Sequence, residues 1–373
     1  MKGFAASRNG SNDPDKPFMA MQLKELLMEA ARQNASDLHL TNHMPPVLRI
    51  DGELLPLKDD VFTEVRLKEM IYGVLSDTQQ IQFEEEKELD FSLAFDGLDR
   101  FRVNVHQQRG SIEAAFRRIP LFIPTVEDLH LPLAIPMLAR KKNGLVLITG
   151  PTGMGKSTTL AAMVQLINTE QKCLVMSIED PIEFLHTNKK AIIKQREVFK
   201  DTHSFAEALK RCLRQDPDVI VVGEMRDLET ISTVLTAAET GHLVLATLHT
   251  PDAPQTIERI IDVFPPYQQQ QVRQQLSSCL QGVVSQRLMP RASGRGRALA
   301  LEIMIATPAI RNMIREQAIE QIPTAMQTGA QFGMKTMDRS LKELVETGQI
   351  TLDTALANAK NIEELRQFLK FPV

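Results

Sequence analysis

The sequence predicts an α/β protein with two domains, a small strand-rich one followed by a larger one built on a mainly parallel sheet. In the first third, short runs alternate apolar with polar residues, which is typical of antiparallel strands with one exposed face. In the rest, short apolar runs are separated by helical patterns, which indicates parallel strands buried on both faces. A chain of 373 residues, 43% of them apolar, can bury two such cores.

The first domain is expected over residues 19–119. The lead before it, residues 1–18, is rich in Ser, Asn, Asp, Pro and Lys and has the composition of a disordered segment. Apolar residues recur at helical spacing between Met19 and Asn34 and predict a helix there. Strands are then expected at residues 37–40, 47–50, 89–95, 100–107 and 112–118, with turns at Asp51-Gly52 and Asp96-Gly97.

The second domain is expected over residues 125–373, after a linker at 120–124 that begins and ends with proline. Apolar runs within it alternate with helical patterns, which predicts a parallel sheet covered by helices, as in a RecA-like P-loop core. The tail after Pro308 is expected to be helical, with segments ending near Gly348 and around Leu369. The apolar runs are residues 145–149, 174–178, 219–222 and 242–247.

A glycine-rich G-x-x-x-x-G-K-S loop follows the first apolar run and predicts a nucleoside triphosphate site. Its glycines let backbone N–H groups surround the phosphates, Lys156 reaches the β- and γ-phosphate oxygens, and the Ser157 hydroxyl can ligate Mg²⁺. The helix that follows presents its positive N-terminus to the anion. The residues expected to bind ATP are Gly150, Pro151, Thr152, Gly153, Met154, Gly155, Lys156, Ser157 and Thr158.

Two acidic motifs follow buried strands of the second domain. The strand at 219–222 leads into Gly223-Glu224, which places a carboxylate beside Mg²⁺ or its water shell at the carboxyl edge of the sheet. The strand at 174–178 leads into a segment, Glu179 to Glu183, with three carboxylates, one of which is a candidate to polarise the attacking water. Either motif alone could be an ordinary strand end, but their occurrence with a P-loop favours phosphoryl chemistry.

A histidine ends the last of the apolar runs, in Thr247-Leu248-His249-Thr250. Two interpretations stay open for His249: a sensor of the γ-phosphate, or a hydrogen-bonded histidine at a strand end. His242 and His249 show no metal-ligand spacing with other residues, so no metal beyond Mg²⁺ is expected.

One strand of the first domain is cationic on one face. Arg100, Arg102, Asn104 and His106 alternate there with apolar residues, and the next strand adds Arg117. A solvated polar face is one interpretation of this alternation. The other is that these guanidinium groups act as arginine fingers on the triphosphate of a neighbouring subunit, because planar bidentate cations suit a developing phosphoryl charge.

Composition disfavours several classes of protein. The formal net charge of −4 and the pI near 6.1 are unlike a nucleic-acid-binding protein with a basic stripe. No apolar stretch approaches the roughly 20 residues of a membrane span, and the chain start lacks the apolar core of a signal peptide, which predicts a cytoplasmic location. The three cysteines are scattered and form no C-x-x-C pair, so neither a disulfide framework nor a zinc site is expected.

Taken together, the motifs resemble the secretion ATPases of type II secretion and type IV pili, and among them the pilus retraction motors. The resemblance covers residues 19–369. Met154 departs from it, because the family loop usually has Ser at that position. The motifs that carry the resemblance are the loop at 150–157, the acidic segment 178–183, Gly223 to Asp227, the histidine segments 239–242 and 247–250, and Ala309 to Glu316.

The resemblance implies a hexameric ring of subunits, each with a PAS-like N-terminal domain and a RecA-like C-terminal domain. ATP is implied to lie between the two domains, and its hydrolysis to rotate one against the other. The implied roles are phosphate and Mg²⁺ binding for Lys156 and Ser157, water activation for Glu183, the Walker B acid and Mg²⁺ site for Glu224, sensing for His249, and arginine fingers for Arg102 and Arg117.

The segment Ala309 to Glu316 resembles the signature of retraction motors apart from Met313. Its own pattern predicts an amphipathic helix that begins after Thr307 as N-cap and Pro308 at the first position, with one face in the core and a solvated face that carries the arginines. The residues implied to couple the motor to the pilus are Arg311, Asn312, Ile314 and Arg315.

Retraction of type IV pili is the favoured function, because extension motors of this family usually carry an additional N-terminal domain and many insert a four-cysteine zinc motif. The implied partners are the inner-membrane pilus platform protein and the rest of the pilus machinery, and the implied location is the cytoplasmic base of that machine. Alternatives are an accessory retraction ATPase and a motor of pilus extension or type II secretion. Two further alternatives belong to other classes of protein: a RecA-like nucleic-acid translocase, and a scaffold that binds ATP without hydrolysing it.

Overall fold

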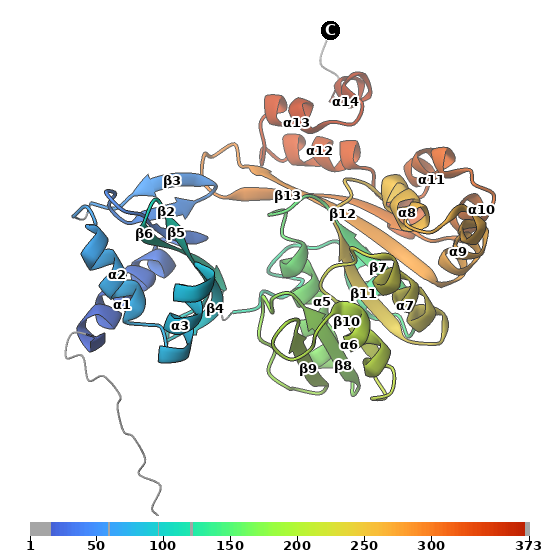
Figure 1. Cartoon of the computed structure of the whole chain (residues 1–373). Coiled ribbons are helices and arrows are strands. Elements are labelled where there is room, and N and C mark those ends of the chain that lie inside the picture. Colours follow the sequence, from blue (N-terminus) through green and yellow to red (C-terminus); the bar gives the residue numbers. More distant parts are fainter. Residues whose placement is uncertain (1–15, 59, 96, 120–121, 370–373) are drawn as a thin grey trace, which may run out of the picture. The chain divides into compact units, whose positions relative to one another are not determined.

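The computed structural model describes all residues except 1–15, 59, 96, 120–121 and 370–373. The chain divides into two compact units, Met1–Leu121 and Phe122–Val373, and each is described by itself (Figure 1). Most of the expected disordered lead, residue 96 of one expected turn and residues 120–121 of the expected linker lie outside the described residues.

The first unit is a six-stranded antiparallel sheet with the strand order β3-β2-β1-β6-β5-β4. The turn predicted at Asp51-Gly52 is confirmed: both residues have positive φ, 50° and 97°, which a tight hairpin turn of the primed type requires. The elements are α1 (Lys16–Arg32), β1 (Asp37–Leu40), β2 (Val47–Ile50), β3 (Glu53–Pro56), α2 (Glu64–Tyr72), α3 (Asp77–Glu86), β4 (Glu88–Ala94), β5 (Arg100–Gln108) and β6 (Ser111–Ile119).

One face of this sheet is covered by the three helices, and the other is polar. Phe101 and Phe116 are fully buried on the covered face, in one core with Leu23 and Leu27 of α1. Successive side chains of a strand point to opposite faces, so the residues between these positions lie on the other side. Helices α2 and α3 have N-caps, Thr63 and Ser76, but their weak apolar periodicity did not predict them.

The second unit is a seven-stranded sheet with the order β13-β12-β7-β11-β10-β8-β9. All four apolar runs predicted as strands are strands of its parallel part, so the predicted α/β fold is confirmed. Strand β12 continues the parallel part beside β7, and β13 returns antiparallel. The strands are β7 (Gly144–Thr149), β8 (Leu174–Glu179), β9 (Ile192–Glu197), β10 (Val219–Val222), β11 (Leu243–Leu248), β12 (Leu280–Pro290) and β13 (Arg297–Ile305).

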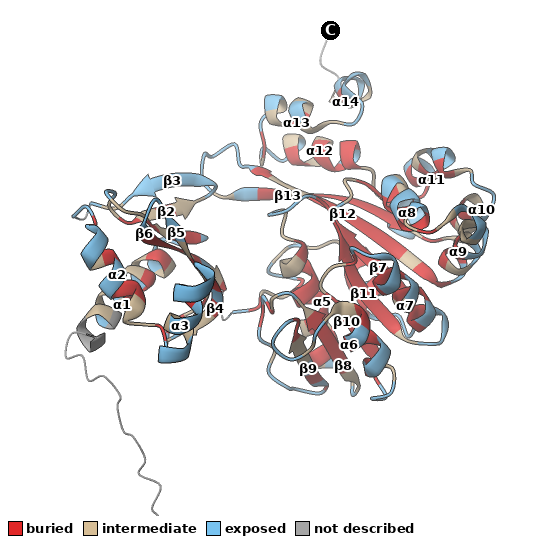
Figure 2. Ribbon diagram, viewed as in Figure 1, coloured by how far each residue is buried: buried red, intermediate tan, exposed pale blue. Residues whose placement is uncertain are grey.

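Helices cover both faces of this sheet, which explains why its central strands β7 and β11 are buried at every position (Figure 2). Val146 and Ile148 of β7 share a core with α4 and α5, whereas Leu145 and Leu147 share a core with helices α6 to α11. The covering helices are α4 (Ala134–Ala139), α5 (Lys156–Glu170), α6 (Phe205–Cys212), α7 (Leu228–Glu239), α8 (Ala253–Asp262), α9 (Pro266–Cys279), α10 (Pro308–Arg315) and α11 (Ile322–Thr328).

The tail after Pro308 is helical, as predicted. Its last three helices, α12 (Met337–Glu346), α13 (Leu352–Asn358) and α14 (Ile362–Leu369), form a small separate core with the hairpin of β12 and β13. Within the part of the chain that the structure describes, no helix is long and apolar enough to cross a membrane.

Candidate nucleotide site

The predicted motifs meet at one edge of the second sheet. Strands β7, β11, β10 and β8 are parallel neighbours in that order. Each continues, at its carboxyl end, into one motif: the loop at 150–155, the histidine segment, Gly223-Glu224 and the acidic segment. Crevices at the carboxyl ends of parallel strands are where open α/β sheets bind ligands.

The backbone of the P-loop is shaped to receive an anion. Gly150 has φ 137°, and a Cβ there would lie 2.4 Å from the carbonyl oxygen of Gln286 on β12. Gly155 is the N-cap of α5 with φ 79°, and no side chain caps this helix. The first turn of α5 therefore presents N–H groups that a phosphate can accept, which fits a bound nucleotide.

Lys156 lies at the centre of this loop with 8% of its surface exposed. Its Nζ donates to the carbonyl oxygens of Gly150, at 2.7 Å, and Pro151, at 3.0 Å. Burial lowers the pKa of Lys156, and the charges of Glu224 and Glu183 oppose that effect. Both predicted carboxylates thus act on the lysine that is expected to hold the phosphates.

His249 connects Lys156 with Glu224. Its Nδ1 lies 3.4 Å from Lys156 Nζ and 3.3 Å from Thr152 Oγ1, and its Nε2 lies 3.1 Å from Glu224 Oε1. Because an ammonium group can only donate, Nδ1 accepts, and the ring proton is on Nε2, where it donates to the carboxylate. His249 therefore lies between the glycine-rich loop and Glu224.

Glu224 is held on its other side by a residue that we did not single out from the sequence. Arg226 Nη2 donates to Glu224 Oε2 at 2.7 Å. Burial raises the pKa of Glu224, but the hydrogen bond and charge of Arg226 and the hydrogen bond of His249 outweigh it, so the pKa lies below its ordinary value. Glu224 is accordingly a carboxylate, and with the Ser157 hydroxyl at the start of α5 it supplies the hard oxygen donors that Mg²⁺ prefers.

The acidic segment holds three carboxylates, Glu179, Asp180 and Glu183, in contrasting environments. Glu179 is half-buried and accepts from Ser177 Oγ at 2.6 Å, and burial raises its pKa. Glu183 is exposed, although its neighbours Ile182 and Phe184 are buried. Asp180 is exposed as well, so Glu183 and Asp180 are open to a water molecule, whereas both oxygens of Glu179 accept hydrogen bonds within the protein.

Residues of β12 and β13 brace the P-loop, and the sequence carries no pattern that predicts them. Gln286 Nε2 donates to the Met154 carbonyl at 2.8 Å, and Arg297 Nη1 donates to the Gly153 carbonyl at 3.2 Å. The Met154 sulfur lies 3.2 Å from the backbone nitrogen of Leu288. The side chain of Met154 is therefore directed at β12.

Arg102 and Arg117 lie in the first unit, which is described separately from the unit that carries this edge. They are directly opposite each other on β5 and β6 and share the polar face of that sheet. Arg117 Nε donates to Asp37 Oδ1 at 2.9 Å, and the side chain of Arg117 is 66% exposed.

Helix α10 begins at Pro308 after Thr307 as N-cap, as predicted. The expectation that Arg311 projects from a solvated face is wrong. Arg311 is half-buried and donates to the carbonyl oxygens of Ala306, at 2.9 Å, Ser277, at 2.7 Å, and Ser278. It satisfies carbonyl groups at the end of α9, and burial lowers its pKa. Within the coupling set, Asn312 and Arg315 are exposed and Ile314 is buried in the core.

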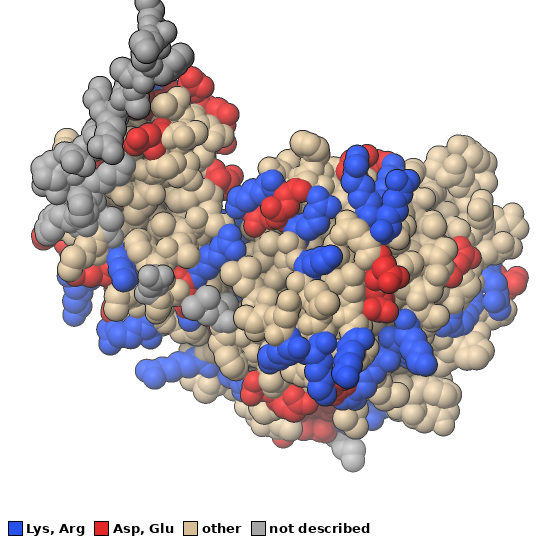
Figure 3. Space-filling model, turned by 90° about the horizontal axis from the view of Figure 1, so that it is seen from below, with Lys and Arg blue, Asp and Glu red and all other residues tan. Residues whose placement is uncertain are grey.

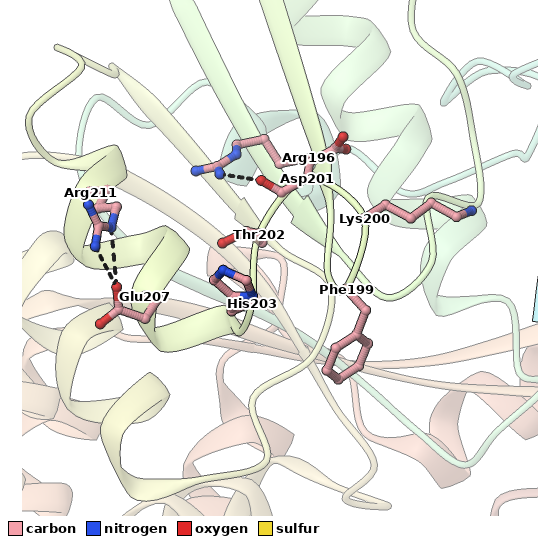
Figure 4. Close-up of a pocket in the computed structure, with 8 residues that line it drawn as sticks. All are labelled: Arg196, Phe199, Lys200, Asp201, Thr202, His203, Glu207 and Arg211. Carbon is pink, nitrogen blue, oxygen red and sulfur yellow. Dashed lines mark hydrogen bonds and ion pairs between the residues drawn. The ribbon is translucent and has the colours of Figure 1, made fainter. Parts of the chain in front are cut away.

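A separate pocket of 390 Å³ lies between the end of β9 and the start of α6. Arg196 donates to the Asp201 carbonyl at 2.6 Å, and Arg211 pairs with Glu207 at 3.0 Å (Figure 4). The residues that line the pocket are Arg196, Phe199, Lys200, Asp201, Thr202, His203, Glu207 and Arg211, none of which is a predicted site residue.

A P-loop, a strand-end acid and a strand-end histidine on one edge of a parallel sheet define a P-loop ATPase. Comparison with known proteins agrees with this class: a model of the Type II/IV secretion system protein family matches residues 131–367. The chain belongs to this family.

The chain is similar to named members of the family over nearly its whole length. It is 48% identical to the Type IV pilus retractation ATPase PilT of Pseudomonas aeruginosa, over 91% of this chain and 98% of that protein. It is 44% identical to a twitching motility protein of Neisseria gonorrhoeae, over 93% of each. A crystal structure of the pilus retraction motor PilT with bound ADP superposes with a TM-score of 0.84, at 48% identity over 92% of this chain and 98% of that one. The predicted resemblance is confirmed, and the protein is a nucleotide-using ATPase.

Proposed function

We propose that this protein is the motor that retracts type IV pili by hydrolysing ATP. The observation that carries the proposal is the similarity to a retraction ATPase across 98% of that relative's length. The retained nucleotide site supports it, because Lys156, Glu183 and Glu224 occupy the edge of the sheet where such chemistry takes place.

Each residue of the site has a role that its environment supports. Lys156 binds the β- and γ-phosphates, and Glu183, exposed beside the P-loop, accepts the proton of the attacking water. Bound Mg²⁺, held by Ser157 with Glu224 or its water shell, would neutralise the phosphate oxygens. His249 is hydrogen-bonded to both Lys156 and Glu224, so it can report the loss of the γ-phosphate to the Walker B strand.

Assembly into a hexameric ring is part of the proposal. In such a ring, Arg102 and Arg117 serve as arginine fingers on the nucleotide of a neighbouring subunit. Arg102 and Arg117 are directly opposite each other on one sheet face, where, of the two, only Arg117 pairs with Asp37 among the contacts of the described residues, and planar guanidinium groups suit a phosphate ligand. The pilus platform protein and the inner-membrane base of the machine are the proposed partner and location.

Two alternatives make different predictions. A motor for pilus extension or type II secretion shares this core, but deletion of its gene should not leave many immobile pili on the cell surface. A nucleic-acid translocase requires a continuous basic surface. The face drawn in Figure 3 instead shows Lys and Arg interspersed with Asp and Glu on the ATPase unit, and the formal net charge is −4.

Deletion of the gene, scored for surface pili and twitching, tests the proposal. Loss of a retraction motor should leave many surface pili without movement, whereas loss of an extension motor should leave none. Complementation with wild-type protein should restore twitching, and complementation with Lys156→Ala should not. A bald strain, or one with normal twitching, would contradict the proposed direction of work.

A further inference from the structure

The segment that carries Glu183 has no regular secondary structure. Residues 180–191 connect β8 to β9, and within them buried Ile182 and Phe184 flank exposed Glu183. Phe184 packs against Ala161 of α5, the helix that begins at the P-loop. The carboxylate of Glu183 is thereby placed near the phosphate site, but no strand pairing secures the backbone on either side of it.

The side chain of Gln195 makes the backbone hydrogen bonds that a neighbouring strand would otherwise make. Gln195 of β9 donates from Nε2 to the Phe184 carbonyl at 2.7 Å and accepts from the His186 N–H at its Oε1 at 2.9 Å. A single amide thus engages a C=O and an N–H two residues apart, as a neighbouring strand does. Its removal would leave both backbone groups without this partner.

Gln195 also acts on the other side of Glu183. Its Nε2 donates to Glu179 Oε1 at 3.1 Å, and Glu179 Oε2 accepts from the Glu183 N–H at 3.3 Å. The backbone is therefore held directly after Glu183 and, through the carboxylate of Glu179, at Glu183 itself. Burial raises the pKa of Glu179, and the hydrogen bond from Gln195 opposes that shift.

We propose that Gln195 is the positioning residue that holds Glu183 against the attacking water. The proposal rests on the assignment of Glu183 as the water-activating carboxylate. The role needs both a donor and an acceptor, which is the chemistry of an amide. Asn168 makes similar hydrogen bonds at the far end of the same segment, to the Thr187 carbonyl and from the Lys189 N–H. Gln195 is therefore the side chain that fixes the backbone beside Glu183.

The test compares Gln195→Met with Lys194→Met in the full-length protein. Methionine keeps the length of glutamine and removes both hydrogen-bonding groups, whereas Lys194 is an exposed neighbour on the same strand. Gln195→Met should lower kcat by about tenfold to a hundredfold, the range for a misplaced catalytic group, while KM for ATP stays within about threefold. Lys194→Met should leave both constants unchanged.

A second background separates positioning from a general structural role. In Glu183→Gln protein, Gln195→Met should have almost no further effect on kcat, because a residue that acts through Glu183 has nothing left to position. A full additional loss in that background would overturn the proposal. Should circular dichroism show that Gln195→Met is unfolded, Gln195→Glu replaces it: it keeps the acceptor for His186, loses the donor and should show the same loss of kcat.

The two assignments fail in different ways. If Glu183→Gln is strongly impaired but Gln195→Met behaves like Lys194→Met, the positioning role is overturned and the role of Glu183 stands. If Glu183→Gln turns over ATP at a near-normal rate, the assignment of Glu183 is wrong and the positioning role is overturned with it.

Discussion

At the scale of single residues, the nucleotide site depends on charged groups in unusual environments. Lys156 is buried among backbone carbonyls, and two carboxylates offset part of the cost of its burial. Its main chain is set by the glycines of the loop and by the start of α5. The ammonium group is therefore expected to contribute charge to phosphate binding and little to the stability of the fold.

We predict that Lys156→Ala abolishes ATP turnover and leaves the fold intact. The reason is that the variant loses the charge that stabilises the transferred phosphoryl group, while the loop backbone keeps its shape. Steady-state ATPase assays and thermal unfolding check this, with a midpoint expected within about 3 °C of wild type. The exposed Lys142→Ala variant is the control. Unfolding of Lys156→Ala would show that the lysine is structural.

A second residue-scale prediction concerns His186, in the segment that carries Glu183. Burial lowers the pKa of His186 from 6.5 to about 4. A histidine with a depressed folded-state pKa must stay neutral, so its stabilising effect is complete above pH 6.5 and is lost as the pH falls toward 4. The shift corresponds to roughly 3 kcal/mol of unfolding free energy at most.

Chemical unfolding of wild type and His186→Gln between pH 7.5 and about 4 measures this contribution by difference. Wild type should lose more stability than the variant across that window, because the amide does not titrate. Parallel curves would show that His186 is accessible and titrates normally in the folded protein.

At the scale of elements, helix α10 combines two tasks that the sequence did not separate. Arg311 donates to backbone carbonyls around the end of α9, which ties the two helices together. Asn312 and Arg315 are exposed, and Arg315 Nη2 donates to Asn312 Oδ1 at 3.3 Å. Of the residues expected to couple the motor to the pilus, this pair is exposed and can meet a partner.

We predict that Arg315→Ala keeps ATPase activity and oligomerisation and loses pilus retraction. Truncation of an exposed side chain opens no cavity and should change the unfolding free energy by less than about 0.5 kcal/mol. Twitching, ATPase rate and size-exclusion chromatography are the measurements. Wild-type twitching by the variant strain would refute a coupling role for this face of α10.

Arg311→Ala serves as the contrasting variant. It leaves several carbonyl groups without a charged donor and should lower the unfolding free energy by about 1–3 kcal/mol. A loss of twitching in Arg311→Ala therefore cannot by itself identify a coupling residue, and a variant as stable as wild type would contradict the structural role.

At the scale of the whole molecule, the proposed motor works only as an assembly. The arginines proposed as fingers and the P-loop belong to different compact units of the chain. Arg102 and Arg117 also lie far from the P-loop in sequence, and the proposal assigns them to the nucleotide of an adjacent subunit. Activity should therefore depend on the pairing of intact subunits.

We predict that a mixture of inactive Lys156→Ala and inactive Arg102→Ala subunits regains part of the ATPase activity. In mixed rings, some interfaces join an intact loop with an intact arginine, and those sites can stabilise the transition state. The rate should rise with the fraction of mixed rings, measured by native mass spectrometry. Absence of rescue in verified mixed rings would show that Arg102 acts within its own chain or only in folding.

The class of chemistry and the parallel sheet were predictable from the sequence because both depend on local patterns. The P-loop spacing specifies a phosphate-binding turn by itself. Apolar runs such as that of β7 indicate strands buried on both faces, and parallel neighbours bring Glu224 and His249 to the edge that carries the loop. The helices α2 and α3 were missed because their apolar periodicity is weak, and strands β3, β9, β12 and β13 were not predicted either.

Only the tertiary structure decided which side chains hold these groups in place. Gln286 and Arg297 reach the P-loop from positions 132 and 144 residues away, and Arg311 reaches the end of α9 across 34 residues. Gln195 meets the acidic segment because β9 lies beside β8. A hydrogen bond between distant residues leaves no periodic trace in a sequence, since any polar side chain of suitable length could make it. The sequence by itself determined what chemistry the protein performs, and the packing of strands determined which residues position it.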